Sequence, residues 1–91
     1  MSESFACTVT IRNKRGLHAR ASAKFVTLAV AFDASVKVSK DGSSVCGTSI
    51  MGLMMLAAAP GDDIVISGAG AGAEQAVVAL AKLVEDRFGE D

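Results

Sequence analysis

Apolar and small or polar residues alternate along residues 5–11 of the chain. The apolar positions of this segment are Phe5, Cys7, Val9 and Ile11. Because successive side chains of a strand point to opposite faces of a sheet, a period of two predicts a strand with one buried face. Residues 13–16, which include two basic residues and a glycine, are expected to form a loop after this strand.

The spacing of apolar residues changes to a helical period between residues 19 and 32. One stripe of this segment consists of Ala21, Phe25, Leu28 and Phe32. A second stripe is more polar and consists of Arg20, Lys24 and Thr27. The segment is therefore predicted to be an amphipathic helix whose apolar stripe faces the core.

The middle of the chain contains a hairpin signal. Val36 and Val38 alternate with lysines, which predicts a second strand. The dipeptide Asp41-Gly42 follows and is typical of two-residue hairpin turns, so a third strand is predicted over residues 43–47.

The second half of the chain predicts two helices and one more strand. Ser49 is a favourable N-cap for a short helix over residues 50–56, which Pro60-Gly61 separates from a strand over residues 63–67. A closing helix is expected over residues 73–88. Its predicted inward positions are Val77, Leu80, Val84 and Phe88.

The predicted element order is β-α-β-β-α-β-α, which favours an α+β fold with one sheet and helices packed on one face. The length of 91 residues is enough for a single domain, here residues 1–91, with one modest core. The order of the strands within the sheet does not follow from the sequence pattern.

Composition excludes several classes of protein. Hydrophobic residues make up 51% of the chain and charged residues 21%, which argues against a disordered chain. The longest apolar run, residues 50–59, is too short to span a bilayer, and no secretory signal is visible. Cys7 and Cys46 are too few and too far apart for a disulfide framework, so we expect reduced thiols and a cytoplasmic protein.

Charge is distributed unevenly along the chain. Residues 1–40 hold seven basic and two acidic residues, whereas residues 41–91 hold two basic and eight acidic ones. This asymmetry favours an anionic ligand or partner for the first half, unless folding mixes the two halves in space. Nucleic acid is disfavoured because the chain has no Trp or Tyr for stacking and an acidic pI. One His and two isolated Cys predict no metal site, and no cofactor is expected.

A glycine-rich segment at residues 68–73 has the form G-x-G-x-x-A between a strand and a helix. This form is that of the dinucleotide-binding fingerprint. However, only 18 residues follow Ala73, which leaves no room for the next strand or for the acidic residue that would hold a ribose. The segment is therefore interpreted as a turn.

The single histidine, His18, lies where the predicted loop meets the first helix. The positive end of a helix dipole favours a neutral imidazole, which keeps a lone pair for nucleophilic attack. An oxyanion on the ring would meet the backbone N–H groups of Ala19 and Arg20, and the Arg20 guanidinium matches phosphoryl oxygens. Spacing alone leaves open that His18 is a surface residue or a cap.

Two motifs of the sequence resemble those of a known protein family. Gly16-Leu17-His18-Ala19-Arg20 resembles the active-site motif of HPr, the histidine-containing phosphocarrier of the bacterial phosphoenolpyruvate-dependent phosphotransferase system. Ser49-Ile50-Met51-Gly52-Leu53-Met54 resembles the regulatory-serine segment of the same family. The resemblance extends over nearly the whole chain and implies a four-stranded antiparallel sheet with three helices on one face, an open-faced β-sandwich.

The resemblance implies a function and its residues. His18 would accept a phosphoryl group on Nδ1 from phosphorylated enzyme I and pass it to enzyme IIA domains, with Arg20 stabilising the phosphate. The chain would be a carrier rather than a stand-alone enzyme. Ala21 stands where the family usually has proline, which points to a regulatory, nitrogen-type system rather than a sugar-transporting one.

Partner contacts are expected around the histidine and on the methionine-rich helix. The expected partner-binding residues are Leu17, Ala19, Arg20, Lys24, Ile50, Met51 and Met54, with Leu53 and Leu56 inward. Ser49 would be phosphorylated by HPr kinase/phosphorylase, and the carrier would be a monomer. The alternative is a regulatory binding module that acts through Ser49 and the methionine face, without obligatory phosphotransfer. The acidic residues Asp86, Glu90 and Asp91 are interpreted as a solvated chain end.

Overall fold

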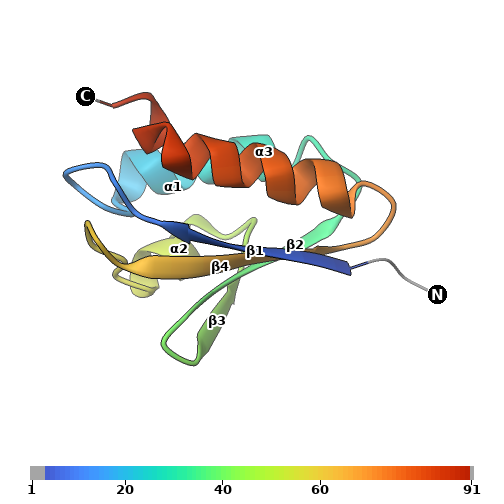
Figure 1. The fold of residues 1–91 in the computed structure, drawn as a ribbon, viewed down its shortest axis with the longest axis horizontal. Coiled ribbons are helices and arrows are strands. Elements are labelled where there is room, and N and C mark those ends of the chain that lie inside the picture. Colours follow the sequence, from blue (N-terminus) through green and yellow to red (C-terminus); the bar gives the residue numbers. More distant parts are fainter. Residues whose placement is uncertain (1–3, 91) are drawn as a thin grey trace.

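The computed structural model describes residues 4–90, which form one antiparallel sheet and a layer of helices (Figure 1). The strands are β1 (Ser4–Thr10), β2 (Ser35–Lys40), β3 (Ser43–Cys46) and β4 (Asp63–Ala69). The helices are α1 (Ala19–Ala29), α2 (Ile50–Met55) and α3 (Ala73–Glu85), and a 3₁₀ turn (Arg87–Gly89) follows α3. The predicted α+β class, with three helices and a four-stranded antiparallel sheet, is confirmed.

The strand order is β1-β4-β2-β3, so the last strand of the chain lies between the first two. Strand β4 pairs with β1 in the register Cys7 to Ile66 and with β2 in the register Val38 to Ile66. A strand with neighbours on both sides and helices on one face favours fully buried apolar residues, and Ile64 and Ile66 have no exposed surface.

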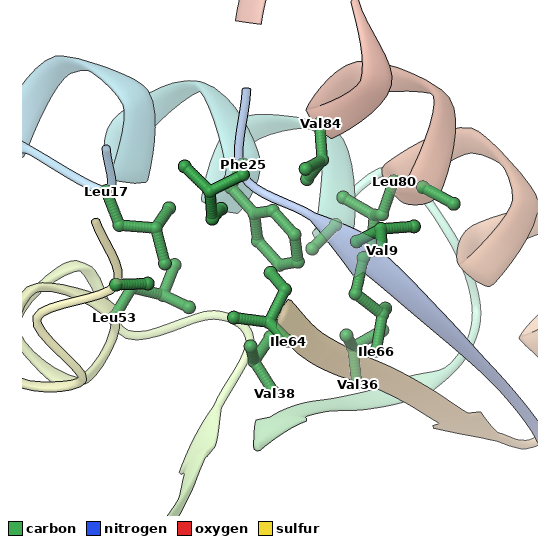
Figure 2. Packing of buried hydrophobic residues seen from close by; sticks show 14 of the residues in the cluster. Val9, Leu17, Phe25, Val36, Val38, Leu53, Ile64, Ile66, Leu80 and Val84 are labelled. Carbon is green, nitrogen blue, oxygen red and sulfur yellow. The ribbon is translucent and has the colours of Figure 1, made fainter. Parts of the chain in front are cut away.

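One hydrophobic core lies between the sheet and the helices. Helices α1 and α3 lie along one face of the sheet (Figure 1), and α2 packs against α1 and beside β3. Figure 2 shows Leu17, Phe25, Leu53 and Ile64 converging in this core, so the segment before α1, two helices and the central strand share a single buried cluster.

The Asp41-Gly42 hairpin forms as predicted, with positive φ at both residues and with Lys40 opposite Ser43. Strand β3 ends at Cys46 rather than at residue 47, although the Gly47 N–H still donates to the Val36 carbonyl at 2.8 Å. The glycine-rich segment is a turn only at residues 70–72, because Gly68 and Ala69 belong to β4.

The first helix ends earlier than predicted, at Ala29, with Val30 as its C-cap. Leu28, which lies within the helix, and Phe32, which lies beyond it, pack against the core but are only partly buried. Ser22 and Ala29 occupy the inner face with Ala21 and Phe25. Of the four residues of the predicted stripe, Ala21 and Phe25 are fully buried, and Leu28 and Phe32 are partly exposed but pack against the core.

The closing helix also ends earlier than predicted, at Glu85 instead of residue 88. Phe88 is fully buried as expected, but it reaches the core from a turn with positive φ at Arg87 and Phe88 rather than from the helix. This turn redirects the chain beyond α3.

No helix within residues 4–90 combines the length and the apolar character needed to cross a lipid bilayer.

Candidate functional site at the start of the first helix

His18 lies at the N-cap position of α1 with extended backbone, φ −75° and ψ −180°. The first helical hydrogen bond at this end runs from the Ser22 N–H to the His18 carbonyl at 2.9 Å. The N–H groups of Ala19 and Arg20 precede it, and the His18 side chain does not cap them. Free backbone donors therefore surround the end of the helix beside the imidazole.

Three contacts build the loop that carries the histidine. Gly16 has φ +65°, and a Cβ at this position would lie 2.3 Å from the Ala58 carbonyl oxygen. The Leu17 N–H donates to the same carbonyl at 3.0 Å, and the Asn13 side-chain amide donates to the Gly16 carbonyl at 2.8 Å. Backbone contacts to Ala58 and to the buried Asn13 thus fix the position of the backbone that leads into His18.

The imidazole contacts a residue from the other end of the chain. His18 Nε2 lies 2.7 Å from Glu90 Oε2, and the two side chains are 19% and 20% exposed. Asn13 Nδ2 donates to Glu90 Oε1 at 3.0 Å. Figure 1 shows that the C-terminal end and the loop before α1 lie at the same end of the molecule.

The prediction that Glu90 belongs to a solvated chain end was therefore wrong. The residue is only partly exposed because the turn after α3 carries it back over the loop. Asp86 is exposed as expected, and Asp91 lies outside the described residues. Sequence reasoning missed Glu90 because 72 positions separate it from His18. The available signal was Phe88, an apolar residue that must be buried within an otherwise polar end.

Hydrogen bonds to the Glu90 carboxylate favour its ionised form. The pKa of Glu90 is lowered by the hydrogen bond from Asn13 and, further, by the hydrogen bond and charge of His18 and by the charge of Lys24, against the opposing effect of desolvation. An ionised carboxylate can only accept hydrogen bonds, so Nε2 of the ring is the donor. When the ring is neutral, the other nitrogen, Nδ1, holds the lone pair.

Two cations from α1 lie close to this end of the helix. Arg20 and Lys24 are exposed and line a groove of about 480 Å³ with Ala23, Thr27, Leu28 and, from α3, Leu83. Lys24 Nζ also donates to the Phe88 carbonyl at 2.6 Å. The predicted polar stripe of α1 and part of α3 therefore form one continuous surface.

Helix α2 is capped by Ser49, whose Oγ accepts from the Gly52 N–H at 3.0 Å. Its predicted orientation is confirmed: Leu53 and Leu56 are buried, and Ile50, Met51 and Met54 are exposed. Met55, which was not predicted, is the most exposed of these residues at 78%. The structure does not bring Ser49 into contact with His18.

Leu17 needs a correction. It was expected on the partner surface, but it is buried and packs in the hydrophobic core. An apolar side chain there anchors the segment before His18 instead of contacting a partner. Ala19 is exposed beside the histidine.

Among the residues from 4 to 90, no group of three or more His, Cys, Asp or Glu side chains is placed to hold a metal ion. The groups gathered at the helix start are an imidazole, a carboxylate, an amide, two cations and backbone donors. This arrangement suits a nucleophilic nitrogen and a bound oxyanion.

Comparison with known proteins gives consistent results. Residues 5–86 match the family described as "PTS HPr component phosphorylation site". The chain is 49% identical to phosphocarrier protein HPr of Cupriavidus necator, over 89% of this chain and 91% of that protein. It is 40% identical to phosphocarrier protein NPr of Shewanella violacea, over 90% of each.

A solved structure agrees in fold. The structure of HPr from Thermoanaerobacter tengcongensis superposes with a TM-score of 0.91 at 41% identity, covering 96% of this chain and 98% of that chain. The match extends across the sheet, the helices and the loop that carries His18. On this evidence, the chain belongs to the HPr family of phosphocarrier proteins of the phosphotransferase system.

Proposed function

We propose that His18 is the phosphoryl acceptor, taking the group on Nδ1 from phosphorylated enzyme I and passing it to enzyme IIA domains. The observation that carries this proposal is the 2.7 Å contact of Nε2 with Glu90, which engages one ring nitrogen and leaves Nδ1 to act as the nucleophile on the residue that N-caps α1. A nitrogen lone pair next to an oxyanion-binding helix end is the arrangement that phosphoryl transfer requires.

The transfer needs little machinery from this chain. The Nδ1 lone pair forms a bond to phosphorus, and the bond between phosphorus and the donor breaks, with its electron pair remaining on the donor. The backbone N–H groups of Ala19 and Arg20 and the Arg20 guanidinium would stabilise the charge on the phosphoryl oxygens. The step is mostly positioning and charge stabilisation, shared with the partner's active site.

The proposal is tested by intact-mass spectrometry after incubation with phosphoenolpyruvate and enzyme I. We expect one added phosphoryl group that acid treatment removes, because a phosphorus–nitrogen bond is acid-labile. Unmodified protein, in a reaction where enzyme I phosphorylates another carrier, would contradict the proposal.

The docking surface for these partners would combine the groove beside Arg20 and Lys24 with the exposed residues Ile50, Met51 and Met54 of α2. An apolar patch with a basic rim suits partners with a complementary acidic rim. Met55 extends this patch. The carrier would act as a monomer in the cytoplasm, and the free thiols of Cys7 and Cys46 are in keeping with that reducing compartment.

Replacing Arg20 with alanine is expected to slow phosphoryl transfer by about 10- to 100-fold, the loss of one charge-assisted contact. This loss is far smaller than that for removal of His18, because the backbone donors remain. Rapid-quench assays of transfer from enzyme I would measure it. Lys37→Ala is the matched control, since it removes one exposed positive charge from the outer face of β2. Equal losses for Arg20→Ala and removal of His18 would contradict this division of roles.

A second candidate function is supported by the exposed face of α2, where Met51 and Met55 are 69% and 78% exposed. In this alternative the chain is a regulatory binding module, switched by phosphorylation of Ser49 by HPr kinase/phosphorylase. Phosphate at a helix N-terminus is electrostatically favourable, so the modification would change the charge of a docking surface without unfolding α2.

The alternative predicts that Ser49→Asp changes the choice of partner even when His18 is replaced by alanine. Ser49→Asn is the matched control, because both residues are good N-caps and only the aspartate adds charge. Pull-down experiments with the two double variants would measure the difference. Identical partner profiles would remove the regulatory module as an independent function.

A further inference from the structure

The turn after α3 is built to hold one carboxylate in place. Arg87, Phe88 and Gly89 all have positive φ, at 59°, 53° and 74°. Two of these residues have side chains, so the conformation is costly and requires compensating contacts. The compensation is visible: Phe88 is fully buried, and its carbonyl accepts a 2.6 Å hydrogen bond from Lys24 Nζ. The turn therefore fixes the position of Glu90, two residues further on.

Both oxygens of Glu90 are engaged. Oε1 accepts from Asn13 Nδ2 at 3.0 Å, and Oε2 lies 2.7 Å from His18 Nε2. Asn13 is itself fully buried and donates from the same nitrogen to the Gly16 carbonyl. The carboxylate is thus held by a buried amide and directed at one nitrogen of the ring.

The chemistry of a phosphorylated imidazole depends on that nitrogen. When phosphorus is bound to Nδ1 and a proton stays on Nε2, breaking the phosphorus–nitrogen bond releases a neutral imidazole. When the Nε2 proton has been lost, the same step must release an imidazolide anion, which is a far poorer leaving group. Retaining the Nε2 proton therefore decides whether the phosphoryl group can be passed on.

We propose that Glu90 is a positioning residue that keeps a proton on Nε2 of His18 both before and after phosphorylation. This inference rests on His18 being the phosphoryl acceptor. Before transfer, the contact directs the incoming phosphoryl group to Nδ1. After transfer, it keeps the ring in the form that releases the group as neutral imidazole. A phosphoryl group on Nδ1 does not displace the contact between Nε2 and Glu90, because the two nitrogens are separate ring atoms on either side of the carbon Cε1.

The other charged groups near this pair do not replace the carboxylate. Lys24 faces Glu90 from α1, and Arg20 lies on the same helix near its start. Helix α2 contributes no titratable side chain, and the tail adds Asp86 and Arg87, both exposed. Within residues 4–90, Glu90 is thus the only acidic side chain that contacts the imidazole.

The test compares Glu90→Gln with the parent chain and with Asp86→Asn, which removes one exposed acidic charge from the same tail. In the unphosphorylated proteins, nitrogen NMR reports the tautomer of His18. We expect the Nε2–H form to predominate in the parent and in Asp86→Asn, and to lose population in Glu90→Gln.

In the phosphorylated proteins, Glu90→Gln is expected to make the Nε2 proton easier to remove, because an opposite charge no longer stabilises the protonated ring. Transfer to an enzyme IIA domain would then become roughly tenfold slower at alkaline pH, with little change near neutrality. A merely structural role would lower the rate equally at all pH values. Glu90→Asp, which restores the charge, should recover part of the alkaline rate.

The outcomes separate this inference from the proposed function. Phosphorylation of parent and Glu90→Gln with identical tautomers and identical pH profiles would overturn the role of Glu90 while leaving His18 as acceptor. Failure of the parent chain to be phosphorylated would overturn the proposed function. In that case, an unchanged tautomer in Glu90→Gln would still contradict the role of Glu90.

Discussion

Replacing His18 with alanine is expected to abolish acceptance of a phosphoryl group while leaving the fold intact. The loss should be complete, because no other histidine is present to take over. The backbone donors and Arg20 would remain in the variant, but they can only stabilise a phosphoryl group that a nucleophile has bound. Intact-mass spectrometry after incubation with phosphoenolpyruvate and enzyme I measures the outcome directly.

The fold should tolerate this change because the His18 side chain contributes little to the stability of the folded state. It does not cap α1, and its one polar contact, with Glu90, is between partly exposed groups. Removing such a contact costs about 1 kcal/mol or less. Circular dichroism and thermal unfolding would confirm an intact fold, so that a missing phosphoryl group reports chemistry. Uptake of phosphate by the variant at an acid-labile position would show that the acceptor is another residue.

The elements of the fold were predictable where a local pattern carries the information. The Asp41-Gly42 turn is specified by two adjacent residues that tolerate positive φ, and the structure forms it. The alternation over residues 5–11 and the apolar residues Ile64 and Ile66 specified two strands in the same way. The strand order was not predictable, because the pairing of β4 with both β1 and β2 joins segments that are distant in sequence.

The same distinction explains the candidate site. His18 and Arg20 were found because the loop, the helix start and the motif lie within five consecutive residues. Glu90 was missed because its contact depends on a turn with positive φ at Arg87 and Phe88. Residues other than glycine rarely adopt positive φ, and no sequence pattern predicts it at Arg87 and Phe88.

The ends of the first and closing helices were mispredicted for a related reason. The inward stripe of α1 was extended to Phe32, although the helix ends at Ala29. An apolar residue beyond a helix end can still be partly buried by the turn, so periodicity alone does not reveal where the helix stops. For α2 the pattern was sufficient, since a short capped helix can bury only one side.

Replacing Gly16 with alanine is expected to have the largest effect on stability and to impair phosphoryl transfer at the same time. Gly16 has φ +65°, and its new Cβ would lie 2.3 Å from the Ala58 carbonyl oxygen, so backbone must move. The positive φ and the displacement together should cost about 3 kcal/mol or more. Chemical denaturation of the parent and variant would measure this loss.

The movement should also reach the active site. The Ala58 carbonyl accepts from the Leu17 N–H, and Leu17 directly precedes His18, so moving one displaces the other. A misplacement of about 1 Å can slow a reaction by about 100-fold. We therefore expect slower phosphoryl transfer in the Gly16→Ala variant even at temperatures where it is fully folded.

Gly42→Ala is the matched control for this prediction. Gly42 also has positive φ, at +85°, but a Cβ there would have no heavy atom within 4 Å. That variant should lose only the backbone preference, about 1 kcal/mol, and should transfer phosphate at the parent rate, since the hairpin turn between β2 and β3 is separate from the loop before α1. Similar losses of stability in the two variants would show that the close approach to Ala58 does not set the position of the loop. A normal transfer rate in folded Gly16→Ala would show that His18 is positioned by its other contacts, chiefly Glu90.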